Sequence, residues 1–208
     1  MPRLPRPPAA LPALRASDTR RLGRGQLIWR IYRAAGSHPT AWNDFRYHGP
    51  VPTGRFDHQE PPRHDDPDRG ILYAALDITG ALAESFQDTR TIDRERHEPW
   101  LVGFELELEL MVLDLTRLWP TRAGASQAIA TGRRDVAREW SLRIYDAYAA
   151  VQALLYRSSM AGGSTNLAFY ERATESLPFG PRFHAPLTHP GLALPLQRTA
   201  ARLGYSLR

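Results

Sequence analysis

The stretch GILYAALDITGALAESFQ, residues 70–87, decides the fold because it joins a short buried strand directly to a helix. The apolar run 71–76 predicts the strand. A helix is expected over about 79–90, since the side-chain oxygen of Asp77 or Thr79 can accept the unpaired N–H groups of its first turn. Glu84 lies on this helix among Ala, Leu and Phe. It is therefore either a solvent-facing carboxylate or one that is held in place for chemistry.

The chain on either side predicts strands and helices in an irregular order. Further strands are predicted at 27–33, 102–115, 151–157 and 165–171, and helices at 122–131, 133–150 and 195–203. Strand-rich stretches with few helices favour an α+β fold over a regular βαβ alternation.

Residues 102–115, VGFELELELMVLDL, carry the clearest periodicity in the chain. Apolar residues alternate with Glu105, Glu107 and Glu109, which predicts one strand with a buried face and a wet face. The three carboxylates are interpreted as a solvated strand face that pairs with Arg on a neighbouring strand.

The length of 208 residues suits one large domain, and 42% hydrophobic residues is ordinary for a globular protein. We expect a Pro/Arg-rich tail over residues 1–26 and a single domain over 27–208. The chain has no cysteine and no apolar run long enough to span a membrane. The N-terminus lacks the apolar core of a secretory signal, so a cytoplasmic location is expected.

All 27 basic residues are Arg, and the net charge is +5. They are scattered and, after residue 40, interleaved with acids. A solvated basic surface, a phosphate-bearing small ligand and a nucleic acid all remain open as explanations.

Two other kinds of site are not supported by the spacing of their residue types. The pairs His64-Asp65 and His184…His189 match no metal-ligand motif, so no metal is expected. There is no G-x-S-x-G elbow, and Ser158 alone is typical of a turn residue.

Arginine side chains at two positions are harder to explain by solvent exposure alone. Arg30 lies inside the apolar strand LIWRIYR, and Arg55 follows two prolines and Gly54. Alternation allows Arg30 to face solvent, but a guanidinium fork can also donate two hydrogen bonds to phosphate oxygens.

Short motifs in a fixed order resemble the RES-domain family, which is named for its Arg, Glu and Ser. They are Leu27-Ile28-Trp29-Arg30, Gly54-Arg55-Phe56, Leu72-Tyr73, Ala81-Leu82-Ala83-Glu84, Tyr156-Arg157-Ser158 and Asn166-Leu167-Ala168-Phe169. The similarity covers about residues 27–172. The chain departs from the family pattern at Phe56-Asp57, where Trp-Asn is usual, and in the long loop 58–70.

The resemblance implies an ADP-ribosyltransferase-like fold, with a mixed or antiparallel β core and flanking helices. It also implies the toxin of a bacterial toxin–antitoxin pair that consumes NAD, with water or phosphate as acceptor. NAD is then the substrate, and no cofactor is expected. The implied partner is an Xre-type helix-turn-helix antitoxin that blocks the active site, in a dimer or a hetero-oligomer. A transferase that modifies a protein and an Arg-rich nucleic-acid-binding module remain the alternatives.

The resemblance also assigns roles to residues, beginning with those that act on the scissile bond. Cleavage of the nicotinamide–ribose bond develops positive charge on the sugar. Glu84 would face that charge and hold a ribose hydroxyl, and Ser158 would orient the ribose or the nicotinamide amide.

The remaining expected residues bind the rest of NAD. Arg30 and Arg55 would hold the phosphates. Tyr73 would stack on the planar nicotinamide cation, and Tyr32 is a lesser candidate for a second wall of the pocket.

Overall fold

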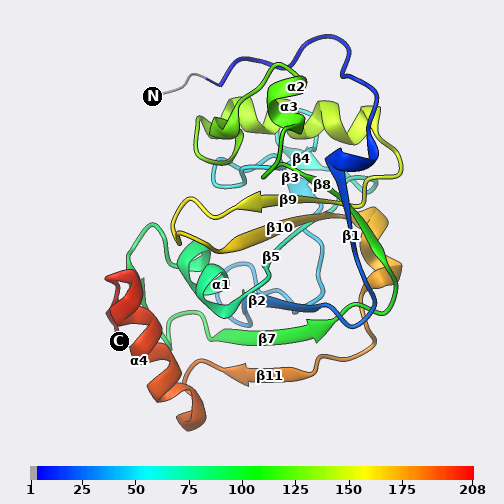
Figure 1. Cartoon of the computed structure of the whole chain (residues 1–208). Coiled ribbons are helices and arrows are strands. Elements are labelled where there is room, and N and C mark those ends of the chain that lie inside the picture. The colour runs from blue at the N-terminus through cyan, green and yellow to red at the C-terminus, as the bar shows by residue number, and fades with distance from the viewer. Residues whose placement is uncertain (1–3) are drawn as a thin grey trace.

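The computed structural model describes residues 4–208, and a mixed eight-stranded sheet runs through it (Figure 1). In spatial order the strands are β1 (Thr19–Leu22), β8 (Leu110–Asp114), β9 (Ala153–Arg157), β10 (Thr165–Tyr170), β5 (Ile71–Ala75), β2 (Leu27–Arg33), β7 (Pro99–Glu105) and β11 (Phe183–Pro186). Only β8 and β9 pair in parallel among these described strands. The expected α+β class is confirmed.

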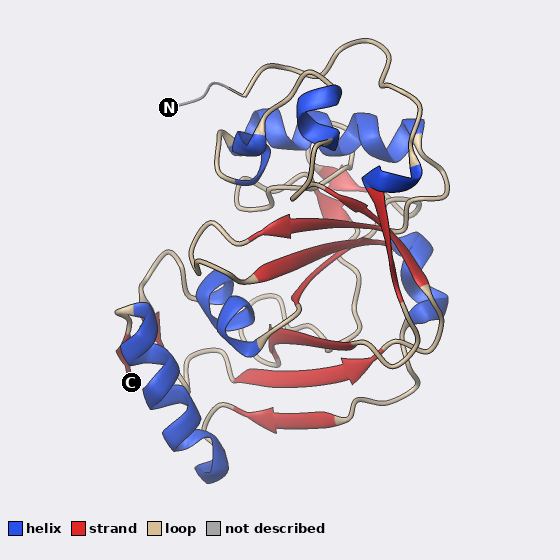
Figure 2. Cartoon of the chain, in the orientation of Figure 1, coloured by secondary structure: helices blue, strands red, loops and turns tan. Residues whose placement is uncertain are grey.

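Helices and two small sheets surround the main sheet (Figure 2). The helices are α1 (Ile78–Ser85), α2 (Trp119–Arg122), α3 (Arg134–Ala147) and α4 (Ala193–Leu203), with 3-10 turns η1 (Ala16–Asp18), η2 (Gln127–Ala130), η3 (Glu171–Ser176) and η4 (Pro190–Leu192). The small sheets pair β3 (His48–Gly49) with β4 (His64–Asp65), and β6 (Thr91–Ile92) with β12 (Ser206–Leu207). None of the helices in the described part of the chain is long and apolar enough to cross a bilayer.

The sheet divides between β5 and β2. These strands pair at a single position, Trp29 with Ala75, and then diverge. Beyond that point Arg46 bridges to Ile71, so the segment before β3 takes the place beside β5 that β2 has left. The divergence of the two strands opens space at the centre of the sheet.

The strand and helix that the opening stretch predicts are both present. Strand β5 ends at Ala75, and Asp77 caps α1 by accepting a hydrogen bond from the N–H of Gly80 at 2.7 Å. Helix α1 ends at Ser85, earlier than the expected residue 90. The predicted helix 122–131 is wrong as one element, because Gly124 adopts a positive φ of 87° between α2 and η2.

The prediction of one strand over 102–115 is wrong. Strand β7 ends at Glu105 and β8 begins at Leu110, and the two lie in different halves of the sheet. Leu106 is buried but Leu108 is 52% exposed, so the alternation continues through a turn that has no sheet face. All three glutamates do pair with Arg, in Arg182–Glu105, Arg24–Glu107 and Arg21–Glu109, but only Arg21 lies on a strand, so the expected strand-to-strand pairing holds only in part.

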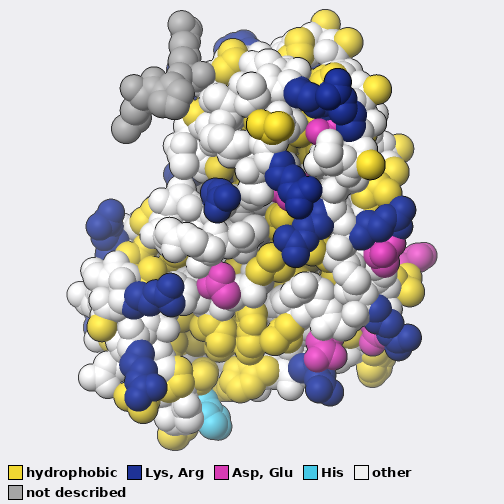
Figure 3. All heavy atoms as spheres, viewed as in Figure 1, with side chains coloured by type: hydrophobic (Ala, Val, Ile, Leu, Met, Phe, Trp, Pro, Cys, Tyr) yellow, Lys and Arg dark blue, Asp and Glu magenta, His cyan; other side chains and the backbone are white. Residues whose placement is uncertain are grey.

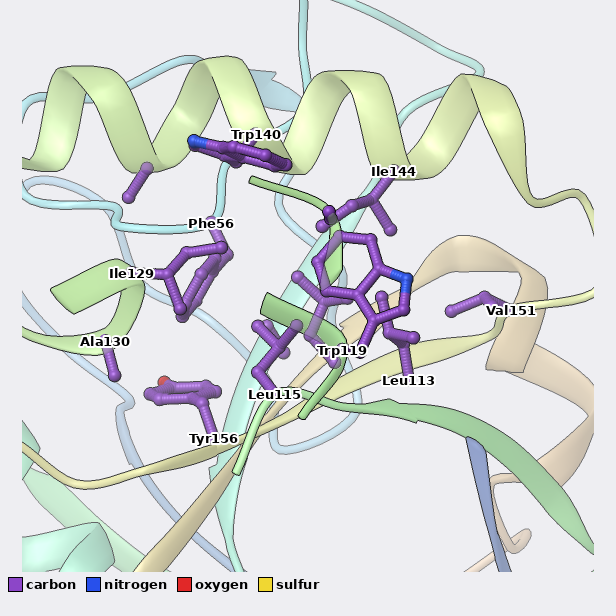
Figure 4. Close-up of a cluster of buried hydrophobic side chains, with 14 of the residues drawn as sticks. Phe56, Leu113, Leu115, Trp119, Ile129, Ala130, Trp140, Ile144, Val151 and Tyr156 are labelled. Atoms are coloured by element: carbon purple, nitrogen blue, oxygen red, sulfur yellow. The ribbon is translucent and has the colours of Figure 1, made fainter. Parts of the chain in front are cut away.

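The largest core lies between α3 and the β8–β9 part of the sheet (Figure 4). Trp140 of α3 meets Trp119 of α2 edge to face, with ring centroids 6.1 Å apart. Phe56 packs on Tyr156 of β9 with centroids 4.6 Å apart. This core fixes the segment around Phe56 against β9, although the two are far apart in the sequence.

The N-terminal segment is part of the fold, so the expected boundary between a tail and a domain at residue 27 needs correction. Strand β1 forms one edge of the main sheet. Before it, the carbonyls of Pro5 and Pro12 accept hydrogen bonds from Trp140 Nε1 at 2.8 Å and from the Tyr148 hydroxyl at 2.6 Å. Residues 1–3 lie outside the described residues.

The loop 58–70 is also less exposed than the sequence suggests. His58 and Gln59 at its start are buried. Gln59 Nε2 donates to the carbonyls of Arg46 and Arg69, at 3.2 and 2.7 Å, which ties the two ends of the loop together.

Candidate functional site

A cleft of about 420 Å³ opens where β2 and β5 diverge. Its walls come from β2, the segment 46–55, β5, α1, the start of α3 and the end of β9. Its charged lining residues are Arg30, Arg33, Arg46, Arg55, Arg134, Glu84 and Asp88. Five guanidinium groups therefore face two carboxylates, which favours an anionic ligand.

Glu84 lies on the last turn of α1 with one carboxylate oxygen occupied and the other free. Its Oε1 accepts hydrogen bonds from Ser158 Oγ at 2.7 Å and from Asn166 Nδ2 at 2.9 Å. No side chain in the described part of the chain bonds to Oε2. Glu84 thus combines a fixed orientation with an open acceptor, as a ligand-binding carboxylate requires.

The hydrogen bonds of Ser158 define which way its proton points. Its Oγ accepts from the backbone N–H groups of Met160 at 3.1 Å and Ala161 at 3.0 Å. Two donors fill the acceptor positions of the hydroxyl, so its own proton goes to Glu84. Ser158 therefore orients Glu84 from the turn after β9.

Helix α1 is fixed close to β10 by small residues and one cap. Asp77 Oδ1 accepts from Ser164 Oγ at 2.9 Å as well as from the helix backbone. At Gly80 a Cβ atom would lie 3.0 Å from Asn166 Oδ1, so only glycine allows this approach without displacement. This close packing brings Glu84 and Asn166 within hydrogen-bond distance.

Tyr73 lines the cleft from β5, but its hydroxyl is used inside the protein. The hydroxyl donates to Asp57 Oδ1 at 2.8 Å and accepts from the N–H of Phe56 at 2.8 Å. Burial, and then the negative charge of Asp57, raise the pKa of Tyr73 well above its usual value. The ring is thus held as a wall in its neutral form.

Asp57, where the family usually has Asn, organises the segment that carries Arg55. It is fully buried, pairs with Arg46 Nη2 at 2.7 Å and accepts from the N–H of Val51 at 2.7 Å. Arg55 itself donates from Nη1 to the carbonyl of Gly132 at 2.6 Å. The departure from the family pattern therefore supplies a structural carboxylate beneath the cleft.

The arginines of the cleft are partly desolvated. Burial lowers the pKa of Arg30 to about 10, although Asp44 opposes the shift. Burial and then the like charge of Arg134 lower the pKa of Arg55. Both groups remain cationic at neutral pH, and their incomplete solvation strengthens attraction to an anion.

Of the six residues that the sequence singled out, five line the cleft or contact its carboxylate. Arg30, Arg55, Tyr73 and Glu84 line it, and Ser158 bonds to Glu84. Tyr32 is not among the lining residues. Its hydroxyl lies 2.6 Å from His184 Nε2, and its ring stacks on Trp100, which turns it toward β7 and β11.

Sequence reasoning missed several residues that line the cleft or bond to its carboxylate. Asn166 and Tyr156 were visible in the motifs of the resemblance but were given no role. Burial and then the charge of Glu84 raise the pKa of Tyr156, so its hydroxyl stays protonated beside the carboxylate. Arg46 and Arg134 come from distant segments, and no motif marks them.

The fold has a counterpart among solved structures. A chain in the crystal structure of the M. tuberculosis MbcT–MbcA toxin–antitoxin complex superposes with a TM-score of 0.55 at 16% sequence identity. The match covers 87% of this chain and 92% of the other. The α+β fold that the resemblance implied is therefore shared with a chain of this complex.

Family assignment rests on the sequence. The RES domain model matches residues 27–190, which is most of the chain, so the protein belongs to the RES domain family. No curated protein sequence matches it.

Proposed function

We propose that this protein is the toxin of a toxin–antitoxin pair and that its cleft cleaves the nicotinamide–ribose bond of NAD, with water or phosphate as acceptor. The observation that carries the proposal is the free Oε2 of Glu84 in a cleft lined by five arginines. Membership of the RES family and a fold shared with a chain of a toxin–antitoxin complex support it.

The chemistry needs one carboxylate and no general acid at the leaving group. As the C–N bond breaks, its electron pair leaves with nicotinamide, which departs neutral, and the ribose becomes oxocarbenium-like. Glu84 Oε2 would accept a hydrogen bond from a ribose hydroxyl and stabilise the growing positive charge. The acceptor oxygen then adds to the ribose carbon, and its proton passes to solvent.

The other cleft residues match the remaining parts of NAD. Arg55 and Arg134 lie close enough for their charges to interact, so a pyrophosphate between them would relieve their repulsion. Arg30 on β2 provides a further guanidinium in the lining of the cleft. The ring of Tyr73 offers a face for the nicotinamide cation.

An antitoxin partner follows from the same proposal. An NAD-consuming cleft that opens to solvent would deplete the host unless something covers it. An Xre-type helix-turn-helix antitoxin would do so in a hetero-oligomer, and coexpression with the neighbouring gene would test the association.

Transfer of ADP-ribose to a protein is the second candidate for the same cleft. It would use the same bond cleavage and differ only in the acceptor. NAD labelled in its adenylate part would then leave label on a macromolecule, whereas hydrolysis or phosphorolysis leaves it on a small product. A nucleic-acid-binding module is less well supported, because the cleft arginines converge on a carboxylate.

The test is the replacement Glu84→Gln, which keeps the shape and removes the charge. We expect the rate of NAD loss by the purified protein to fall about 10²–10³-fold, the usual size for one transition-state stabiliser. Glu175→Gln, the same change at an exposed glutamate on η3, is the matched control and should keep the full rate. Unchanged NAD loss in Glu84→Gln would reject the assignment.

A further inference from the structure

A second cavity, of about 710 Å³, lies where the parallel strands β8 and β9 end, beside η1 and α2. It shares no lining residue with the first cleft. Its lining includes the arginines Arg15, Arg117, Arg122 and Arg157 and the hydroxyl residues Ser17 and Thr121. On the face seen in Figure 3, dark blue side chains gather over β1, β9 and α2.

The acids near this cavity are already neutralised. Asp18, the one carboxylate among the described lining residues, is buried, pairs with Arg122, and accepts the N–H of Arg15 at 2.8 Å. Arg117 pairs with Asp114, whose carboxylate lies 3.1 Å away. An incoming anion would therefore meet little repulsion.

Two guanidinium groups and one buried donor remain unused. Within residues 4–208, neither Arg15 nor Arg157 has a carboxylate partner for its side chain, and both are exposed. The Nε–H of Arg122 is buried without an acceptor in the same described chain. A buried donor without a partner is costly, and a ligand oxygen would satisfy it.

The polar groups of the cavity suit phosphate oxygens. The hydroxyls of Ser17 and Thr121 make no hydrogen bond inside the described part of the chain and can donate beside the guanidinium forks. No aromatic ring is among the described lining residues, so the cavity offers no stacking platform for a base.

We propose that this cavity is a second anion site, which binds a phosphate-bearing small molecule through Arg15, Arg122 and Arg157. Its volume lies in the range of small-molecule sites and exceeds the size of a single phosphate. The two cavities are connected along the backbone at Arg157. Arg157 lines the second cavity, whereas its neighbours belong to the first site: Tyr156 lines the cleft and Ser158 bonds to Glu84.

Calorimetric titration of the full chain with inorganic pyrophosphate tests this site. Because the first cleft also attracts phosphate, the titration uses Arg55→Gln protein whose folding has been verified by circular dichroism. Adding Arg15→Gln or Arg157→Gln should weaken pyrophosphate binding tenfold or more, as expected for loss of a charge-assisted contact. Arg198→Gln on the exposed face of α4 removes the same charge and should leave the affinity within twofold.

Amide chemical shifts in the wild-type protein locate the bound anion without any substitution. Pyrophosphate should shift the amides of Ser17, Thr121 and Arg157. Equal affinity in all these variants, with no shift at those amides, would overturn the proposal. Binding of oligoglutamate without binding of phosphate or pyrophosphate would also overturn it, because it would assign the cavity to an acidic peptide. Both outcomes are independent of NAD cleavage.

Discussion

At the scale of single residues, the hydrogen bond from Asn166 to Glu84 leads to a specific prediction for catalysis. Asn166 Nδ2 donates to the same oxygen of Glu84 that Ser158 bonds. Asn166→Asp keeps the shape but replaces a donor by a second carboxylate. Two carboxylates in contact share a proton, so the apparent pKa values of the pair split and the upper one rises. We expect NAD turnover at pH 7 to fall by about tenfold to a hundredfold.

The pH profile separates this effect from misfolding. The lost activity should return in part as pH rises and the shared proton leaves, whereas a misfolded variant would stay inactive. A profile parallel to that of the wild-type protein, measured as initial NAD loss from pH 6 to 9, would contradict the role of Asn166.

Residue identity alone predicted the cleft arginines better than the aromatic walls. Arg30 and Arg55 stand out because charge inside apolar or proline-rich sequence needs an explanation. Tyr32 and Tyr156 look alike in the sequence, since both are tyrosines in apolar strands. Only their neighbours decide between them: Tyr32 meets His184, while Tyr156 lies beside Glu84.

At the scale of elements, the position of α1 depends on its first turn. Asp77 caps the helix and also accepts from Ser164, which precedes β10. Asp77→Ala should lower the free energy of unfolding by about 1 kcal/mol, the usual cost of a lost cap. It should also lower NAD turnover about tenfold, because a small displacement of Glu84 spoils its alignment. Urea denaturation and initial rates measure the two effects.

Asp93→Ala provides the matched comparison. Asp93 accepts the backbone N–H groups of Glu95 and Arg96, at 3.1 and 3.0 Å, in a turn outside the cleft lining. We expect this variant to lose stability and keep its turnover. If Asp77→Ala also kept its turnover, the cap would stabilise the helix without positioning Glu84.

Elements were predictable where the local pattern and the tertiary contacts agree. The strand 27–33 and the strand–helix pair after Gly70 have such agreement, because each is apolar and bounded by its own start or stop signals. The segment 102–115 does not. Its alternation is uniform, but Glu105 ends one strand and Leu110 begins another in a different part of the sheet. An alternating pattern carries no signal for the residue at which a strand stops pairing with its neighbour in the sheet.

At the scale of the whole molecule, the cleft exists because the sheet is not continuous. Strand β2 bonds fully to β7 but meets β5 at one position, and Arg46 pairs with Ile71 instead. Such a competition between two segments for one strand edge depends on long-range contacts. The sequence could therefore indicate which residues act together but not the gap that gathers them.

The N-terminal segment gives the last prediction, because it looks like a tail and packs like part of the core. Proline-rich sequence shows no periodicity, but its carbonyls are free to accept, and Trp140 and Tyr148 donate to two of them. Leu4 is only 9% exposed. Deletion of residues 1–14 should therefore uncover α3 and lower the free energy of unfolding by roughly 3–6 kcal/mol, from lost apolar burial and two unpaired donors.

Urea denaturation of the shortened chain measures this loss, and Tyr148→Phe in the full chain isolates the contribution of one hydroxyl donor, the one that bonds to the carbonyl of Pro12. The deletion begins and ends away from the cleft lining, so NAD turnover of the folded fraction should persist at low temperature. A change in unfolding free energy below about 1 kcal/mol would mean that the N-terminal segment contacts α3 without contributing appreciably to stability. A large change with turnover retained would mean that the sheet and its N-terminal cover form one cooperative unit that begins well before residue 27.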